Sequence, residues 1–217
     1  NFSEFKPQQE AIIEAVLANE DCIALLPTGG GKSICFQIPA LIRDGICIVV
    51  SPLVALMQDQ VNNLNAKGIK AMALTSGFSY DDIDRMLDNC VFGNYKFLYL
   101  SPERLQQDLV QQRIKQMNVN LIAVDEAHCI SQWGHDFRPA YRDIKLLRTL
   151  HPSVNVIGLT ASATSKVIDD ISEQLDFISP QVFKTSFKRS NLAYLSLECQ
   201  DKHFRTVQVL KKYSGTS

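Results

Sequence analysis

The feature that most constrains this chain is the alternation of short apolar runs with longer amphipathic stretches. Helical patterns separate the runs, and strands that are apolar on both faces belong to a parallel sheet covered on both sides. The predicted fold is therefore a doubly wound α/β domain. In such sheets ligands bind beyond the carboxyl ends of the strands. The runs that predict strands are residues 22–26, 47–50, 71–74, 97–100, 121–124 and 154–159.

The composition is that of a globular chain and excludes several classes. Of 217 residues, 46% are hydrophobic and 21% are charged, which excludes a disordered chain. No apolar run approaches the roughly 20 residues that cross a bilayer, and no secretory signal is visible. We expect a cytoplasmic protein, nucleoid-associated if bacterial, with no membrane partner. The six cysteines form no C-x-x-C pair, so reduced thiols and no zinc site are expected.

Charge is nearly balanced over the whole chain but not along it. Basic and acidic side chains number 22 and 23, which argues against binding nucleic acid by bulk charge alone. From Lys184 onward, however, seven Lys and Arg stand against two Asp and Glu. An ordinary solvated tail explains this as well as a binding segment does. We place the main domain at 1–183 and a linker at 184–217, with a strand-like run at 192–197 and a helix-like run at 202–213.

A glycine-rich segment follows the first predicted strand and precedes a predicted helix at 34–42. Its glycines permit a tight backbone that directs amide groups at a phosphate. Lys32 would reach the β- and γ-phosphates of a nucleotide, and Ser33 would supply a hydroxyl to Mg²⁺. Leu26 stands where the strict phosphate-loop pattern requires glycine, so a simple turn is the alternative. The segment consists of Pro27, Thr28, Gly29, Gly30, Gly31, Lys32 and Ser33.

A second half of such a site is an apolar strand that ends in carboxylates, and residues 121–126 have this form. Asp125 can hold Mg²⁺ through water, and Glu126 can orient or deprotonate an attacking water. Adjacent acids at a strand end also cap helices. Together with Lys32 they predict binding of a Mg-nucleoside triphosphate.

The motifs along the chain resemble those of a known enzyme family. DEAH (125–128), read with the glycine-rich segment, resembles the first motor lobe of a superfamily 2 helicase, and CISQWGHDFRPAY (129–141) resembles the aromatic-rich loop of the RecQ family of DNA helicases. The resemblance runs from FKPQQ (5–9) to SFKRSNLAY (186–194). Further matching motifs are SPLVALMQDQ (51–60), SPERL (101–105) and LTASAT (159–164).

This resemblance implies a RecA-like P-loop NTPase lobe that uses ATP and Mg²⁺. Its implied partners are single-stranded and partly duplex DNA and a second RecA-like lobe of the same protein, which would begin within 184–217. The implied activity is 3′–5′ unwinding coupled to ATP hydrolysis. The 217 residues alone are expected to bind nucleotide but not to unwind DNA. The rival hypotheses are a nucleotide-gated binding module and an RNA helicase of the same superfamily.

The resemblance also assigns adenine contacts near the start of the chain. Phe2 and Lys6 would sandwich the base, and Gln9 would hydrogen-bond its edge, where a donor lies beside an acceptor. Lys6 replaces the family's usual Arg, so stacking there should be weaker. The residues alone predict only a helix start near Pro7.

The loop at 129–141 carries the predicted single-strand sensor. Trp133 and Phe137 offer flat faces for unstacked bases, and Arg138 offers a cation for a phosphate. A buried aromatic is the commoner fate of a Trp, but the polar neighbours of these rings disfavour it. The resemblance implies that His128 and Gln132 couple the nucleotide site to this loop, with His135 in the same relay. A satisfied surface or core histidine is the alternative for each.

Three further segments end predicted strands and resemble strand-tracking or coupling motifs. Each of the first two alone reads as an ordinary helix start with Pro in its first turn. In the third, small hydroxyl side chains would link the γ-phosphate region to the DNA side. The predicted DNA contacts are Ser51, Pro52, Leu53, Gln58, Pro102 and Arg104, and the predicted coupling residues are Thr160, Ser162 and Thr164.

Overall fold

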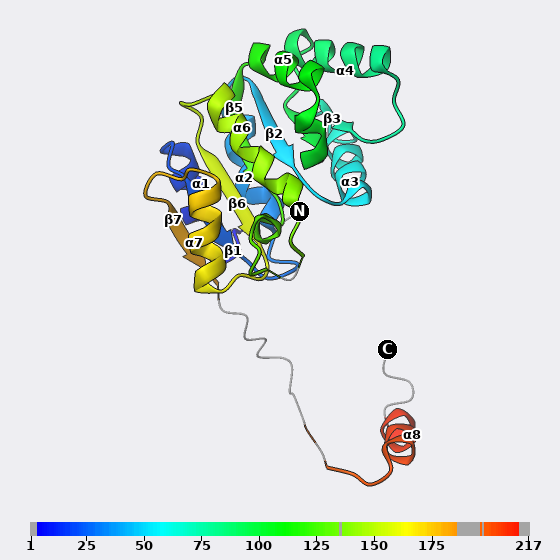
Figure 1. The fold of residues 1–217 in the computed structure, drawn as a ribbon. Coiled ribbons are helices and arrows are strands. Elements are labelled where there is room, and N and C mark those ends of the chain that lie inside the picture. The colour runs from blue at the N-terminus through cyan, green and yellow to red at the C-terminus, as the bar shows by residue number, and fades with distance from the viewer. Residues whose placement is uncertain (1–3, 135, 186–195, 197, 213–217) are drawn as a thin grey trace. The chain divides into compact units, whose positions relative to one another are not determined.

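The computed structural model of the chain describes residues 4–134, 136–185, 196 and 198–212 (Figure 1). The chain divides into two compact units, residues 1–186 and 187–217. The first unit holds a parallel sheet and most of the helices. The second holds the helix α8 (Lys202–Lys212), whose residues are all exposed. This helix confirms the predicted helical run, while most of the strand-like run at 192–197 lies outside the described residues.

Within the described part of the first unit, the sheet has seven strands, and every pair of neighbours is parallel. The strand order across the sheet is β3-β4-β2-β5-β6-β1-β7. The strands are β1 (Cys22–Leu25), β2 (Ile46–Val50), β3 (Ala71–Leu74), β4 (Phe97–Leu100), β5 (Val119–Val124), β6 (Val156–Thr160) and β7 (Gln181–Lys184).

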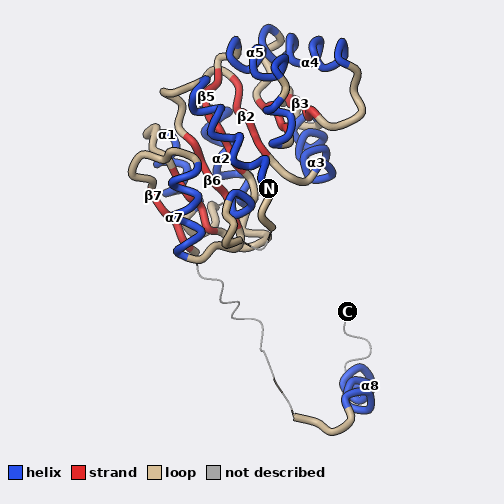
Figure 2. Tube along the Cα trace, viewed as in Figure 1, coloured by secondary structure: helices blue, strands red, loops and turns tan. Residues whose placement is uncertain are grey.

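Helices lie on both faces of this sheet (Figure 2). They connect successive strands, as parallel pairing requires. The α-helices of the first unit are α1 (Gln9–Leu17), α2 (Lys32–Ile42), α3 (Val54–Asn65), α4 (Tyr80–Phe92), α5 (Asp108–Gln116), α6 (Lys145–Leu150) and α7 (Ser165–Gln174). Short 3₁₀ helices are η1 (Pro102–Gln106), η2 (Ala127–Ile130) and η3 (Pro139–Ile144).

Alternate residues of β2 belong to two separate apolar cores. Ile48 and Val50 pack in the core that contains the apolar residues of α4, α5 and α7. Cys47 and Val49 pack in the core that contains those of α1, α2 and α3. Because successive side chains of a strand point to opposite faces, a strand with both faces covered must be apolar throughout. This confirms the predicted α/β sheet with helices on both faces.

All six predicted strands are present, with ends shifted by at most two residues. The seventh, β7, was not predicted. Among the described strands it pairs with β1 alone, at the edge of the sheet, and Val182 is 40% exposed. It therefore lacks the continuous apolar pattern of the central strands. It also extends the sheet to Lys184, one residue beyond the predicted domain boundary.

The strand register brings three predicted motifs to one edge of the sheet. Val50, the last residue of β2, is paired with Leu100 of β4 on one side and with Val124 of β5 on the other. The residues that follow these strands, Ser51, Ser101 and Asp125, therefore lie at the same carboxyl edge.

Among the described helices, none is long and apolar enough to span a bilayer.

Candidate functional site

The glycine-rich segment forms the tight connection between β1 and α2. Gly29 and Gly31 have φ values of 76° and 78°, in the left-handed region that glycine enters without steric cost. A Cβ on Gly30 would lie 2.7 Å from the Pro27 carbonyl oxygen. Helix α2 begins at Lys32, two residues before the predicted start. Its first-turn amides therefore open onto the loop, as in a phosphate-binding helix terminus.

Gln9 and Lys6 hold this loop from the adjacent segment. The buried Gln9 amide donates through Nε2 to the carbonyls of Gly30 (3.2 Å) and Gly31 (3.1 Å), and its Oε1 accepts from Lys6 N (2.8 Å). The Lys6 ammonium donates to the Gly29 carbonyl at 2.6 Å. Lys6 and Gln9 are two of the residues to which the resemblance assigns the adenine contacts. Gln9 must exchange its loop contacts before it can bind a base edge.

A pocket of about 390 Å³ lies beside these contacts. Phe2, the predicted stacking residue, lies outside the described residues. Phe5 does line the pocket and is 49% exposed, so it offers an aromatic face that the sequence interpretation missed. The pocket is lined by Glu4, Phe5, Lys6, Gln9, Gly31, Ile34 and Ile38.

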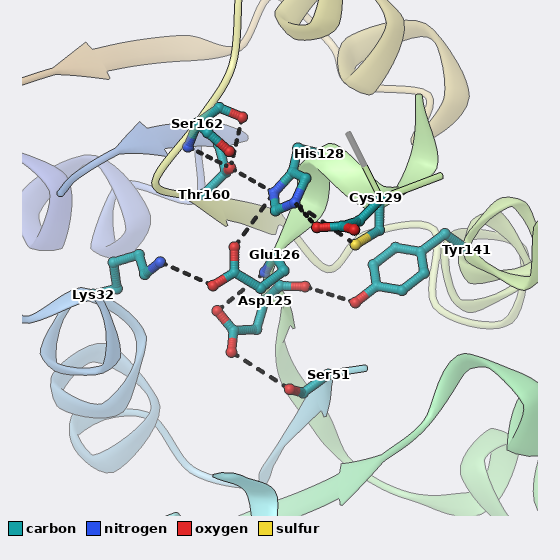
Figure 3. Close-up of polar contacts among 10 residues, drawn as sticks. Lys32, Ser51, Asp125, Glu126, His128, Cys129, Tyr141, Thr160 and Ser162 are labelled. Atoms are coloured by element: carbon teal, nitrogen blue, oxygen red, sulfur yellow. Dashed lines mark hydrogen bonds and ion pairs between the residues drawn. The ribbon is translucent and has the colours of Figure 1, made fainter. Parts of the chain in front are cut away.

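Lys32 and Glu126, predicted from motifs far apart in the sequence, form an ion pair at the centre of the site (Figure 3). The Lys32 Nζ lies 3.1 Å from Glu126 Oε1, and both side chains are mostly buried. Glu126 has φ 47° and ψ 46°, a left-handed conformation that is uncommon for a residue with a Cβ. Such conformations concentrate at functional sites.

Asp125 is buried at the end of β5 and is held by its neighbours. Its carboxylate accepts from the Glu126 amide (3.1 Å) and from the Ser51 hydroxyl (3.4 Å). Burial, together with the adjacent Glu126 charge, raises the pKa of Asp125. The Tyr141 hydroxyl donates to the Asp125 carbonyl at 2.9 Å. The sequence interpretation gave Tyr141 no role, although a buried Tyr hydroxyl requires a partner of this kind.

The donor set around Asp125 fits Mg²⁺. A buried carboxylate whose pKa is raised by desolvation gains from a nearby cation, and Mg²⁺ takes hard oxygen ligands. Ser33, at the start of α2, would supply the hydroxyl. The described residues contain no cluster of three or more His, Cys, Asp or Glu side chains arranged around a metal. Mg²⁺ characteristically binds through one or two protein ligands, water and substrate phosphates.

His128 connects Glu126 to β6. Its Nδ1 lies 2.9 Å from the Thr160 hydroxyl and 3.3 Å from Glu126 Oε2. Its Nε2 lies 3.9 Å from Cys129 Sγ and 3.9 Å from the Asp136 carboxylate. These contacts with Cys129 and Glu126 raise the pKa of His128 to about 9, and the contact with His128, followed by Lys32, lowers the pKa of Glu126. At neutral pH the site therefore holds an imidazolium against a carboxylate.

This pair predicts a pH dependence of stability. The folded pKa of His128, about 9, lies above its ordinary value of 6.5, so the stabilisation is complete below pH 6.5 and is lost as the pH rises through 9. We expect the free energy of unfolding, measured with urea, to fall between pH 6.5 and 9. His128→Gln should flatten this fall, and His203→Gln, on the exposed α8, should not. Equal slopes in all three proteins would contradict the charged pair.

The aromatic loop places Trp133 on the surface. The residue is 63% exposed, which excludes the alternative of a core aromatic. The Lys166 ammonium lies 3.1 Å from the ring centroid. Phe137 is half-buried beneath the Arg142 guanidinium at 5.3 Å. Arg138 donates to the Pro52 carbonyl at 3.2 Å and so ties the loop to the end of β2.

Two other loop residues were predicted to act in coupling. Gln132 is exposed beside Trp133, and its role stays a prediction. His135 lies outside the described residues. Of the three predicted coupling histidine and glutamine residues, only His128 therefore has described contacts to both Glu126 and β6.

Some of the predicted strand-tracking residues are exposed on the surface, and others are buried. Leu53 and Gln58 are exposed, while Ser51 is only 2% exposed. The prediction that the Ser51 hydroxyl binds a DNA phosphate is therefore wrong in this geometry. Its backbone continues β2 by bonding to the Leu100 carbonyl, which turns the hydroxyl toward Asp125. Pro102 is likewise buried, so its ring is not a surface contact.

Pro52 and Arg104 line a common hollow of about 520 Å³. The Arg104 guanidinium is anchored there by the Thr75 carbonyl and by Gln107. Helix α3 begins at Val54, after Leu53, and η1 begins at Pro102. Ser101 is the N-cap residue of η1 and Pro102 lies in its first turn, which agrees with an ordinary helix start, although the Ser101 side chain makes no capping hydrogen bond. In the other segment the N-cap residue of α3 is Leu53, so Ser51 and Pro52 lie before the helix and the helix-start alternative fails there.

The segment after β6 contributes one predicted coupling contact. Thr160 is fully buried, and its hydroxyl contacts His128 Nδ1 while it also accepts from Ser162 N (3.1 Å). Ser162 is exposed. The Thr164 hydroxyl accepts from Val167 N and so caps α7. Thr160 therefore contacts a residue of the site directly, whereas the described contact of Thr164 is the cap of α7.

Comparison with known proteins identifies the family. The DEAD/DEAH box helicase family matches residues 6–171. The ATP-dependent DNA helicase RecQ of Bacillus subtilis (strain 168) is 45% identical over 90% of this chain and 33% of its own length. The probable ATP-dependent DNA helicase RecS of the same organism is 41% identical over 99% of this chain and 44% of its own. The chain thus spans less than half the length of these relatives.

Solved structures agree on the fold. The Hef helicase domain of Pyrococcus furiosus has a TM-score of 0.65 and 24% identity, covering 83% of this chain and 38% of its own. The DEAD-box helicase Mss116, bound to ssRNA and UDP-BeF, has a TM-score of 0.68 and 18% identity, covering 85% of this chain and 40% of its own. The RecA-like lobe is thereby confirmed, and the RecQ relatives confirm the resemblance seen in the motifs. The chain belongs to the DEAD/DEAH box helicase family.

Proposed function

We propose that this chain is the ATP-binding lobe of a RecQ-type 3′–5′ DNA helicase, which couples ATP hydrolysis to single-strand translocation and duplex unwinding. The observation that carries the proposal is a continuous set of contacts from the phosphate-loop lysine to the aromatic loop. Lys32 pairs with Glu126, Glu126 contacts His128, and His128 approaches Asp136 in the loop. Similarity to RecQ proteins over about 90% or more of the chain supports this assignment.

The nucleotide would lie along the glycine-rich loop, with its base in the pocket at Lys6 and Gln9. Lys32 would leave Glu126 for the β- and γ-phosphates, and the first-turn amides of α2 would hold phosphate oxygens. Mg²⁺, held by Ser33 and Asp125, would neutralise charge that develops on the phosphates. His128 keeps hold of the Glu126 carboxylate during this exchange, because it contacts Oε2 and Lys32 contacts Oε1.

In hydrolysis, a water oxygen bonds to the γ-phosphorus, and the bond from that phosphorus to the β–γ bridging oxygen breaks, leaving ADP and phosphate. Glu126 is the proposed acceptor of the water proton. Its contacts with His128 and Lys32 lower its pKa and keep it ionised at neutral pH, so it can orient the water. These contacts also weaken it as a base, and the departure of Lys32 toward the phosphates would remove one of them before it takes the proton. Transition-state charge would also need groups from a second lobe, which the greater length of the relatives supports.

The proposed DNA side of the site comprises the exposed Trp133 and the half-buried Phe137 and Arg138 of the aromatic loop, together with the carboxyl edge of the sheet. Trp133 and Phe137 would stack unpaired bases, and Arg138 and Arg104 would meet phosphates. Thr160, through His128, would link this side to Glu126. We place the protein in the cytoplasm, at the nucleoid if its source is bacterial. The 217 residues alone should bind nucleotide and not unwind DNA.

The test of this function compares DNA-stimulated and RNA-stimulated ATP turnover by the protein extended to the length of its relatives. We expect single-stranded DNA to stimulate turnover strongly and matched RNA to do so weakly. Trp133→Ala should weaken the DNA stimulation by about 5- to 150-fold at limiting DNA, because base stacking contributes about 1–3 kcal/mol per base. Phe92→Ala, which removes an aromatic ring 74% exposed at the end of α4, is the matched control.

The outcome decides between three functions. Equal stimulation by RNA would favour an RNA helicase. Turnover that ignores both polymers, with nucleotide-dependent binding intact, would favour a nucleotide-gated binding module. A DNA response that survives Trp133→Ala would remove the aromatic loop from the proposed sensor.

A further inference from the structure

Lys166 lies over the exposed ring of Trp133 in the aromatic loop. Its ammonium lies 3.1 Å from the Trp133 ring centroid, and Trp133 as a residue is 63% exposed. Lys166 itself is exposed. Within the described part of the chain, this ammonium makes no ion pair with a carboxylate. The ring is therefore its described partner, and its charge is available to an anion.

Both side chains come from positions that the surrounding structure fixes. Lys166 is the second residue of α7, whose first turn is capped by Thr164. The Trp133 amide donates to the hydroxyl of the buried Ser131 at 3.2 Å. Two segments, 33 residues apart along the chain at these two positions, thus present a flat ring and a cation side by side.

A ring beside a cation matches the base and the phosphate of one nucleotide. A base stacks on the face of a Trp in any sequence context, and an adjacent phosphate needs a point charge on a flexible stem, which Lys provides. Base stacking on an aromatic ring is stronger than an exposed contact between an ammonium and a ring. A base can therefore displace the ammonium from the ring while the ammonium gains a phosphate.

We propose that Trp133 and Lys166 form a two-point site for one nucleotide of single-stranded DNA, with the base on the indole and the neighbouring phosphate on the displaced ammonium. This inference rests on the proposed function. It adds the start of α7 to the DNA surface. Because Thr160, six residues earlier on the same segment, contacts His128, a strand held at Lys166 would touch the segment that reaches the nucleotide site.

The chain offers a direct readout, because Trp133 is its one tryptophan. The experiment titrates oligo-dT into the 217-residue protein at several salt concentrations and follows intrinsic fluorescence. Stacking on Trp133 should quench the emission. Lys166→Met should weaken binding several-fold and reduce the slope of log affinity against log salt by about 0.7, the value for one phosphate contact on a single strand. Lys166→Arg should keep the slope.

Lys67→Met is the matched control, since Lys67 is an exposed lysine after the end of α3 and its removal changes the net charge equally. It should match the unmodified protein in affinity and slope. Quenching with an unchanged slope in Lys166→Met would overturn the two-point site and leave the DNA function standing. Tighter binding by Lys166→Met would overturn it too, because Lys166 would then only cover the ring. No quenching in any variant, together with no DNA-stimulated turnover, would mean that the proposed function itself fails.

Discussion

Replacing Glu126 by glutamine is expected to lower ATP turnover by about 10²- to 10⁴-fold while MgATP still binds. Glutamine keeps the shape of the side chain and one oxygen acceptor, but it cannot take a proton from water. In the native protein His128 and Lys32 lower the pKa of Glu126, so the carboxylate is ionised at neutral pH, as a proton acceptor must be. The loss should therefore fall on the chemical step.

The measurement is phosphate release at saturating single-stranded DNA by the protein extended to the length of its relatives, with nucleotide affinity measured in parallel. Glu173→Gln, an exposed acid on α7, makes the same chemical change away from the site and should leave turnover unchanged. If Glu126→Gln retained near-normal turnover, the base would have to be another group. If it lost nucleotide affinity to the same extent as turnover, Glu126 would be a binding residue instead.

The central strands and the ion pair of the site were predictable for related reasons. A strand buried on both faces must be apolar throughout, so the sequence pattern predicts β1 to β6. Polar residues directly after such strands mark the edge of the sheet where ligands bind. Lys32 and Glu126 both follow such strands. The register that pairs Val50 with Val124 then brings the motifs together. Strand β7, exposed at the sheet edge, carries no such signal.

The contacts that complete the site were not predictable, because each depends on the direction of a side chain from a separate segment. Nothing in the sequence shows that Gln9 holds the carbonyl of Gly31 or that Tyr141 donates to the Asp125 carbonyl. Ser51 illustrates the same limit. Its position at the strand end was foreseen, but whether its hydroxyl faces solvent or Asp125 depends on the pairing of β2 with β4 and β5.

The position of β1 in the sheet depends on a buried carboxylate that no motif marks. Asp21 immediately precedes β1, and its side chain is 5% exposed. One oxygen accepts from Val156 N at the start of β6 (2.9 Å), and the other accepts from Ile178 N (3.0 Å) and from the Arg148 guanidinium (2.5 Å). A single carboxylate thus ties α6, β6 and the approach to β7 to the start of β1.

Asp21→Ala is therefore expected to lower the free energy of unfolding by about 3–5 kcal/mol. The change leaves the largely buried Arg148 charge without its partner and two backbone amides without acceptors, and breaking a buried pair from one side costs this much. The measurement is urea unfolding followed by far-ultraviolet circular dichroism. Lys145→Met, which removes the exposed partner of Asp176, should shift the midpoint little, as exposed ion pairs contribute little.

A double variant separates the energetic cost of the unpaired Arg148 charge from the cost of the lost amide hydrogen bonds. Arg148→Met in the Asp21→Ala background removes the unpaired cation, so this protein should be more stable than Asp21→Ala alone. It should remain less stable than the native chain, because Val156 N and Ile178 N still lack their acceptor. If Arg148→Met gave no recovery, the cost would lie in the amide contacts, and Asp21 would act mainly as a cap on the two segments that flank β1 in the sheet.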